Sequence, residues 1–155
     1  METLKIDRKK AIELYPKSSP EFKEVLESTF GKQCFSTNIL DRINSFEDAL
    51  AEKGMKPEDV IMNPNGPVRR IALDKLEFII EVVNEGFIAD YTNGNQKKWR
   101  PYFVFSSSGF GFSASVFNFT HTAAHCGSRL CMKDQLTCDH VRTKFQSLWI
   151  DLLTK

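Results

Sequence analysis

Apolar residues recur at three- to four-residue spacing over much of the first hundred residues, a period that is typical of amphipathic helices. The clearest start signal is Ser19, a preferred N-cap residue, followed by Pro20 and Glu21. Gly31 supplies the matching stop signal. The spacing between these signals therefore predicts a helix from Pro20 to the residue before Gly31.

The same signals predict three later helices. Ser45 is expected to cap a helix that ends at Gly54, and residues 71–84 carry a single apolar stripe. Asp134 is expected to cap a last, long helix whose apolar positions continue to Leu152. These helices lie on both sides of a segment with a different pattern.

In that segment the period changes to two, the signature of β-strands. Residues 99–105 and 110–115 are predicted as strands joined by a turn, and residues 129–133 as a third strand. The order predicts an α+β fold. We expect a small antiparallel sheet of about three strands within residues 99–133, packed against the N-terminal helices and the long C-terminal helix.

Length and composition place the chain among ordinary globular proteins. It has 155 residues, 41% hydrophobic and 26% charged, which predicts one α+β domain over residues 1–155. Residues 1–18 are expected to form a loosely ordered N-terminal arm. A formal net charge of +1 excludes a polycation. Because no long apolar run or secretory leader is evident, we expect a cytoplasmic protein that does not enter membranes.

Cysteine and histidine residues gather late in the chain. The cysteine spacing lacks the tight C-x₂-C pairs of zinc sites, so we expect buried thiols and neither a metal nor another cofactor. A nucleophilic pair of Cys126 with His121 or His125 keeps a cysteine hydrolase open as an alternative. Otherwise the chain shows no catalytic signature and is expected not to be an enzyme. The residues concerned are His121, His125, Cys126, Cys131, Cys138 and His140.

The predicted hairpin is the main functional candidate, because residues 101–128 are rich in aromatic side chains and carry no charge. The aromatic residues are expected either to pack as core or to stack nucleobases, with nearby cations contacting phosphates of a single-stranded nucleic acid or nucleotide. The candidate ligand-binding residues are Lys98, Trp99, Arg100, Tyr102, Phe103, Phe110, Phe112, Arg129 and Lys133.

Several segments together resemble a group of small proteins encoded by bacteriophages and mobile elements of gut Bacteroides-type bacteria. The resemblance covers about residues 20–153 and keeps the order and spacing of the motifs. The matching segments are Ile-Ala-Leu-Asp-Lys-Leu at 71–76, Val-Asn-Glu-Gly at 83–86, Trp-Arg-Pro-Tyr-Phe at 99–103, Ser-Gly-Phe-Gly-Phe-Ser at 108–113 and Gly-Ser-Arg-Leu-Cys-Met-Lys at 127–133.

The resemblance implies a phage- or prophage-encoded protein but no particular function. Together with the aromatic hairpin, it leads us to expect an accessory protein that binds a ligand or macromolecule through its aromatic sheet. Its matching polar residues Asn84, Ser128, Arg129 and Lys133 place a shared ligand site beside the hairpin, unless Arg129 and Glu85 form a structural ion pair. A virion or assembly protein whose aromatic face contacts copies of itself, or a phage or host protein, is the alternative. In that case the virion replaces the host cytoplasm as its location.

Overall fold

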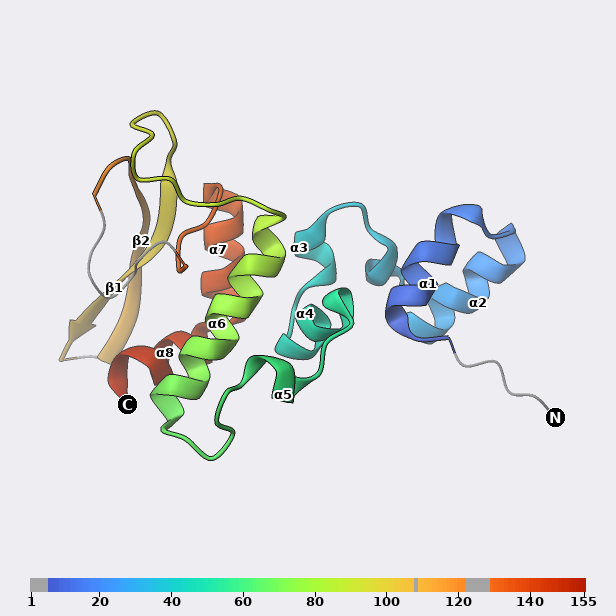
Figure 1. The fold of residues 1–155 in the computed structure, drawn as a ribbon, viewed down its shortest axis with the longest axis horizontal. Coiled ribbons are helices and arrows are strands. Elements are labelled where there is room, and N and C mark those ends of the chain that lie inside the picture. Colours follow the sequence, from blue (N-terminus) through green and yellow to red (C-terminus); the bar gives the residue numbers. More distant parts are fainter. Residues whose placement is uncertain (1–5, 108, 122–128) are drawn as a thin grey trace. The chain divides into compact units, whose positions relative to one another are not determined.

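The computed structural model describes residues 6–107, 109–121 and 129–155. The chain divides into two compact units, Met1–Lys56 and Pro57–Lys155. The fold is α+β, as predicted, with helices in both units and an antiparallel sheet in the second (Figure 1). The expectation of one domain over residues 1–155 stays a prediction.

The described part of the first unit is helical. Its elements are α1 (Arg8–Leu14), η1 (Tyr15–Lys17), α2 (Pro20–Phe30), η2 (Lys32–Phe35), α3 (Ile39–Arg42) and α4 (Phe46–Lys53). Residues 8–17, expected in a loosely ordered arm, are thus helical. The carboxylate of Asp7 accepts a hydrogen bond from the Lys10 backbone N–H at 2.8 Å and caps α1.

The predicted helix boundaries in this unit are confirmed where a cap fixes them. The Ser19 hydroxyl accepts from the backbone N–H of Phe22 at the start of α2, and the Ser45 hydroxyl does the same for Asp48 in α4. Gly31 and Gly54 end these helices with φ of 83° and 67°, backbone values that favour glycine.

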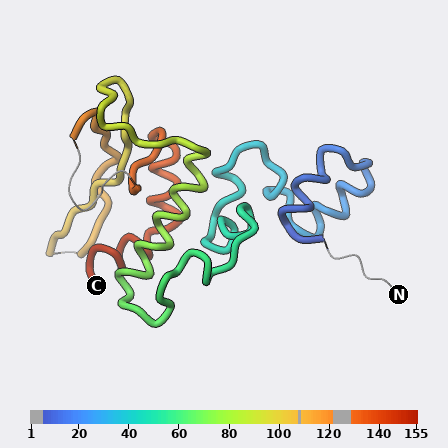
Figure 2. Tube along the Cα trace, viewed as in Figure 1, coloured from blue at the N-terminus to red at the C-terminus, as the bar shows by residue number. Residues whose placement is uncertain are grey.

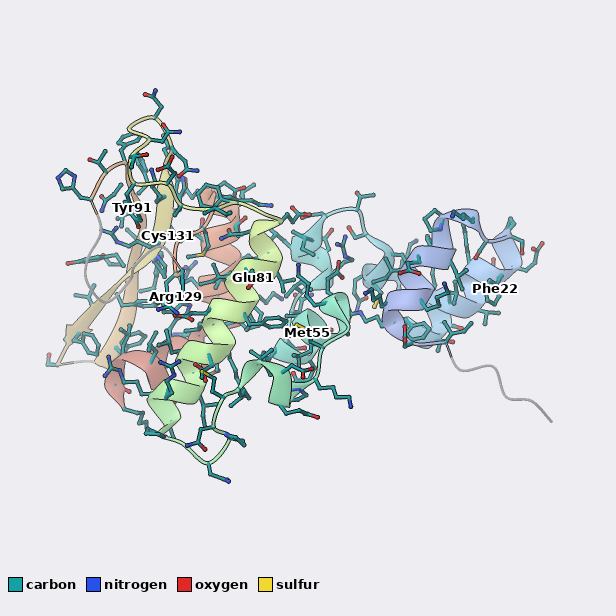
Figure 3. The ribbon with its side chains drawn as sticks, in the orientation of Figure 1. Phe22, Met55, Glu81, Tyr91, Arg129 and Cys131 are labelled. Atoms are coloured by element: carbon teal, nitrogen blue, oxygen red, sulfur yellow. The ribbon has the colours of Figure 1, made fainter. Side chains whose placement is uncertain are left out.

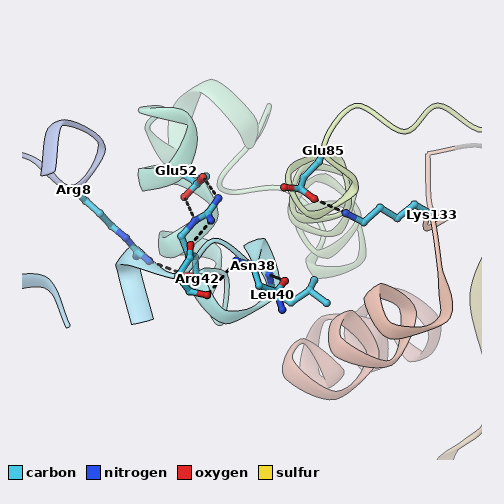
Figure 4. A network of polar contacts seen from close by, with 8 residues as sticks. Arg8, Asn38, Leu40, Arg42, Glu52, Glu85 and Lys133 are labelled. Atoms are coloured by element: carbon cyan, nitrogen blue, oxygen red, sulfur yellow. Dashed lines mark hydrogen bonds and ion pairs between the residues drawn. The ribbon is translucent and has the colours of Figure 1, made fainter. Parts of the chain in front are cut away.

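Two arginines tie the helices of the first unit together (Figure 4). The guanidinium of Arg42 binds both carboxylate oxygens of Glu52, at 2.7 and 3.2 Å, and donates to the Ser36 carbonyl at 2.7 Å. Arg8 pairs with Asp48 and donates to the Arg42 carbonyl at 2.8 Å. Since these side chains are only partly exposed, the network links α1, α3 and α4 as a structural unit.

The second unit places a hairpin and two helices around a central helix. Its elements are α5 (Pro57–Val60), α6 (Val68–Asn84), β1 (Lys98–Ser106), β2 (Gly109–Asn118), α7 (Gln135–Lys144) and α8 (Gln146–Thr154). Figure 2 shows the C-terminal end of the chain returning beside α6, where α8 packs against it. Leu76, Ile79, Val83, Val141 and Trp149 are buried in this core.

The third predicted strand, residues 129–133, is a single β-bridge between Met132 and Trp99. Asn84 holds this segment from the side of α6. Its side-chain amide donates to the Cys131 carbonyl at 2.8 Å, and its carbonyl accepts from the Lys133 N–H at 3.1 Å. The end of α6 thus bonds the main chain on either side of Met132, while Met132 itself bonds to Trp99, and the described sheet has two strands.

The predicted long C-terminal helix is also corrected, because Phe145 separates α7 from α8. Its φ of −116° and ψ of 29° depart from helical values, and its side chain is buried. The break lets α7 contact both strands while α8 packs against α6. A continuous apolar stripe gave no sign of it, since the stretch contains neither glycine nor proline.

Candidate functional site

The register of the hairpin decides which side chains share a face. Tyr102 pairs with Ala114, but Phe103 pairs with Phe112, so Ser113 is an extra residue in β2. Such a bulge shifts the alternation of the strand by one position. As a result, the large residues on both sides of Ser113 point to the same face of the hairpin.

We call this side the aromatic face. Ring contacts follow the assignment: the Trp99 and Phe117 centroids are 4.8 Å apart, and Phe103 stacks on Phe110 at 4.8 Å. Phe105 meets Phe110 edge to face at 5.1 Å. The residues of the aromatic face are Trp99, Phe103, Phe105, Phe110, Phe112 and Phe117.

Helices α7 and α8 cover the middle of the aromatic face. The buried Trp149 lies 5.6 Å from Phe103 between ring centroids, and the guanidinium carbon of Arg142 lies 3.6 Å above the centre of the Phe112 ring. The Ser115 hydroxyl donates to the Asp139 carboxylate at 2.7 Å. Phe103 and Phe112, expected to stack bases, therefore pack against this protein's own helices.

Exposed apolar side chains remain at both ends of the hairpin. Near the tip, Tyr102 is 57% and Phe105 60% exposed, with Val104 between them at 45%. Near the base, Phe117 and Phe119 are 38% and 39% exposed. The hairpin thus combines core packing at its centre with accessible rings at its ends.

Lys98 is corrected as a phosphate-binding residue, because it is fully buried. Its ammonium donates to the carbonyls of Asn93, Gln96 and Phe119 at 3.0, 2.8 and 2.7 Å. The Tyr91 ring centroid lies 5.4 Å away on the same side. All three N–H donors are satisfied internally, so Lys98 holds the preceding loop to the end of β2.

Arg129 and Lys133 lie beside α6 and pair with its carboxylates. Lys133 meets Glu85 at 2.5 Å (Figure 4). Arg129 meets Glu77 at 3.3 Å, so these two pairs replace the expected Arg129–Glu85 pair. The Arg129 side chain is still 75% exposed, so solvent weakens its pair. Of the residues that the resemblance grouped, Asn84 and Lys133 meet directly, and Ser128 lies outside the described residues.

Arg100 lies on the opposite face of the hairpin from Trp99, paired with Val116. It is partly buried, and its Nη1 atom has no hydrogen-bond acceptor among the described residues. Arg100 thus shares a face with the exposed Tyr102 and not with Phe105 or Phe117.

Three residues absent from the predicted set, Lys97, Phe117 and Phe119, lie at the base of the hairpin. The Lys97 ammonium is 4.6 Å from the Phe117 ring centroid, and Phe119 packs edge to face on Phe117 at 5.4 Å. We call Lys97, Phe117 and Phe119 the basal patch. Strand alternation carried back from Trp99 could have placed Lys97 on the aromatic face, and the same spacing of two carried on from Phe117 reaches Phe119.

The described cysteines are buried thiols, and burial raises the pKa of Cys34, of Cys131 and of Cys138, the last to about 12. The Tyr91 hydroxyl contacts the Cys131 sulfur at 3.1 Å and opposes the shift (Figure 3). Because the thiolate is the nucleophile, these three cysteines do not support the hydrolase alternative. Cys126 and His125 lie outside the described residues.

We expect Cys34, Cys131 and Cys138 to resist iodoacetamide at about pH 8 in the folded protein and to react once it is unfolded. Peptide mass spectrometry of the folded and unfolded samples measures the extent of labelling, and labelling of Cys138 in the folded protein at the unfolded rate would contradict the prediction.

The raised pKa also means that the folded state keeps the Cys138 proton. Stability should fall as pH rises from about 9, near the unfolded pKa, toward about 12.

Across residues 6–107, 109–121 and 129–155, no group of three or more His, Cys, Asp or Glu side chains is arranged to hold a metal ion. No helix in this part of the chain is both long and apolar enough to span a bilayer.

The geometry defines an α+β chain with an aromatic two-stranded hairpin braced by its C-terminal helices. No protein-family model, curated protein or solved structure matches the chain.

Proposed function

We propose that this chain is a non-enzymatic accessory protein, of phage or prophage origin as the resemblance implies, that binds single-stranded nucleic acid or a nucleotide at the basal patch. The observation that carries the proposal is the Lys97 ammonium over the exposed Phe117 ring, with the exposed Phe119 ring beside it. Stacking rings with an adjacent cation are what single-strand binders present to bases and phosphates.

The charge of Lys97 supports this role. Among the described residues no carboxylate pairs with Lys97, whereas Arg129 and Lys133 pair with Glu77 and Glu85. A cation without an internal counter-ion binds phosphate with release of the counterions condensed on the nucleic acid. Lys97 therefore replaces Lys98 as the principal phosphate contact.

The surrounding structure keeps the basal patch in place. Trp99 contacts Phe117, and its backbone N–H and C=O both bond to Met132. Lys98 holds the Phe119 carbonyl from inside. Side chains that are already held in place lose less conformational entropy when a base stacks on them. The stacking itself contributes about 1–3 kcal/mol per base to binding.

We expect a labelled single-stranded oligonucleotide to bind more weakly at about 200 mM salt than at about 50 mM, because phosphate contacts release counterions. Phe117→Ala should weaken binding by roughly 10- to 100-fold through lost stacking, and Lys97→Glu by about tenfold or more. Fluorescence anisotropy with the full chain measures both effects.

Lys144→Glu is the matched control for Lys97→Glu, since it makes the same charge change at an exposed position on α7. The proposal requires Lys144→Glu to bind like the unmodified chain. Equal losses for the two charge variants would indicate a diffuse electrostatic effect and overturn the assignment of the basal patch. Absence of any binding by the unmodified chain would overturn the nucleic-acid function itself.

A further inference from the structure

The two rings of the basal patch meet at an angle that fits one base. The centroids of Phe117 and Phe119 are 5.4 Å apart, and the ring planes lie at 79° to each other. Successive bases that stay stacked on each other are nearly parallel, so they do not lie flat on both rings. A base that lies flat on one ring meets the other ring at an edge. The pair therefore forms a single stacking site.

The charge of the basal patch fits one phosphate. Lys97 is its one charged side chain, with the ammonium 4.6 Å from the Phe117 ring centroid. The next two basic residues along β1 add nothing to this charge. Lys98 is buried with its ammonium bound to three carbonyls, and Arg100 projects from the opposite face of the hairpin. The patch thus presents one cation beside one stacking site.

Side chains of α7 bound the basal patch on the side of the hairpin tip. Ser115 shares the aromatic face with Phe117, about 7 Å further along β2. Its hydroxyl donates to the carboxylate of Asp139 at 2.7 Å, and the Asp139 side chain is still 39% exposed. Arg142, 3.8 Å from that carboxylate, is held over the Phe112 ring. A strand that ran from the patch toward the tip would therefore meet a carboxylate and a covered ring.

We propose that the basal patch binds a single nucleotide, with its base on the phenylalanine rings and its phosphate at Lys97. This inference rests on the proposed function and narrows its ligand to one base with one phosphate. A free nucleotide and the terminal nucleotide of a single strand share this chemistry. An internal nucleotide does not fit, because its strand would have to continue from the patch in both directions.

Isothermal titration calorimetry of the full chain tests the proposal with three ligands: a nucleoside 5′-monophosphate, a linear single strand of about 12 nucleotides and a circular strand of the same length. The circular strand has no terminal nucleotide, so it should bind at least about tenfold more weakly than the better of the other two. A circular strand that binds as tightly as the linear strand overturns the single-nucleotide site and leaves the proposed nucleic-acid function standing.

The same titrations separate the two sources of the ligand. Binding of the monophosphate with an affinity close to that of the linear strand supports a site that a free nucleotide fills. Binding of the linear strand alone supports a site for strand ends. Absence of binding by all three ligands contradicts the nucleic-acid function itself, and the single-nucleotide site with it.

The salt dependence of binding counts the phosphates. One contact with a single strand predicts that affinity falls only about threefold between about 50 and about 200 mM salt. A loss of about a hundredfold or more would require several phosphate contacts and would overturn the proposal.

Phe119→Ala should weaken every ligand that binds by the same factor, roughly 10- to 100-fold, because all of them use one stacking site. Phe105→Ala is the matched control, since it removes a ring that is 60% exposed near the tip of the same face. It should leave binding of the linear strand unchanged, and circular dichroism would verify that both variants fold. A weaker linear strand with Phe105→Ala would mean that the strand extends along the hairpin, which overturns the proposal.

Discussion

Replacing Lys98 with methionine is expected to lower the free energy of unfolding by about 3 kcal/mol. Methionine keeps much of the buried chain length but removes the ammonium that binds three carbonyls, those of Asn93, Gln96 and Phe119. Each carbonyl must then find water or remain unsatisfied in a partly buried site. Thermal denaturation followed by circular dichroism should show a decrease in Tm of roughly 10 °C.

Lys97→Met is the matched control, since it removes the same charge one residue earlier from an exposed side chain. It should change stability by no more than about 0.5 kcal/mol, as is usual for surface substitutions. Equal stability of the Lys98 and Lys97 variants would contradict a structural role for Lys98. A destabilised Lys98→Met variant should also bind oligonucleotide less well, because Lys98 holds the backbone of Phe119.

Local signals accounted for much of the helical structure. A capping hydroxyl or carboxylate acts on the N–H group a few residues later, so its effect is contained within one turn. Ser19, Ser45 and Asp134 all accept the expected backbone hydrogen bonds. The two hairpin strands followed in the same way from a local change of period.

The composition of the candidate site depended instead on pairing between distant residues. The bulge at Ser113 is visible only when β2 is aligned with β1, and it decides that Phe110 and Phe112 share a face with Phe117. Without the bulge, a period of two along β2 would place Phe110 and Phe112 on one face and Phe117 on the other. Alternation along one strand therefore could not separate covered rings from exposed ones.

Charge gave the least guidance, because a lysine carries the same sequence signal whether its ammonium meets solvent or carbonyls. Lys97 and Lys98 are neighbours in the sequence, yet one is exposed above a ring and the other is fully buried. The difference arises from the loop before β1 and the residue after β2, which together supply the carbonyls. Only the folded chain brings these segments together.

Asn84→Ala is expected to lower the free energy of unfolding by about 2–3 kcal/mol, the range for leaving buried polar groups unsatisfied. Asn84 is 6% exposed at the end of α6 and supplies both a donor to Cys131 and an acceptor to Lys133. Alanine can do neither, so the segment that pairs through Met132 with Trp99 loses its support on the α6 side. Chemical denaturation monitored by tryptophan fluorescence measures the change.

Glu85→Ala provides the comparison that separates this role from the adjacent ion pair. Glu85 contacts Lys133 at the surface, and losing that pair should cost no more than about 1 kcal/mol. If Asn84→Ala is no more destabilising than Glu85→Ala, the two hydrogen bonds from the Asn84 side chain to the main chain of Cys131 and Lys133 do not hold that segment in place. If the large difference appears, Asn84 acts beside the hairpin as a structural residue, and the proposed ligand binding is left to the exposed rings and Lys97.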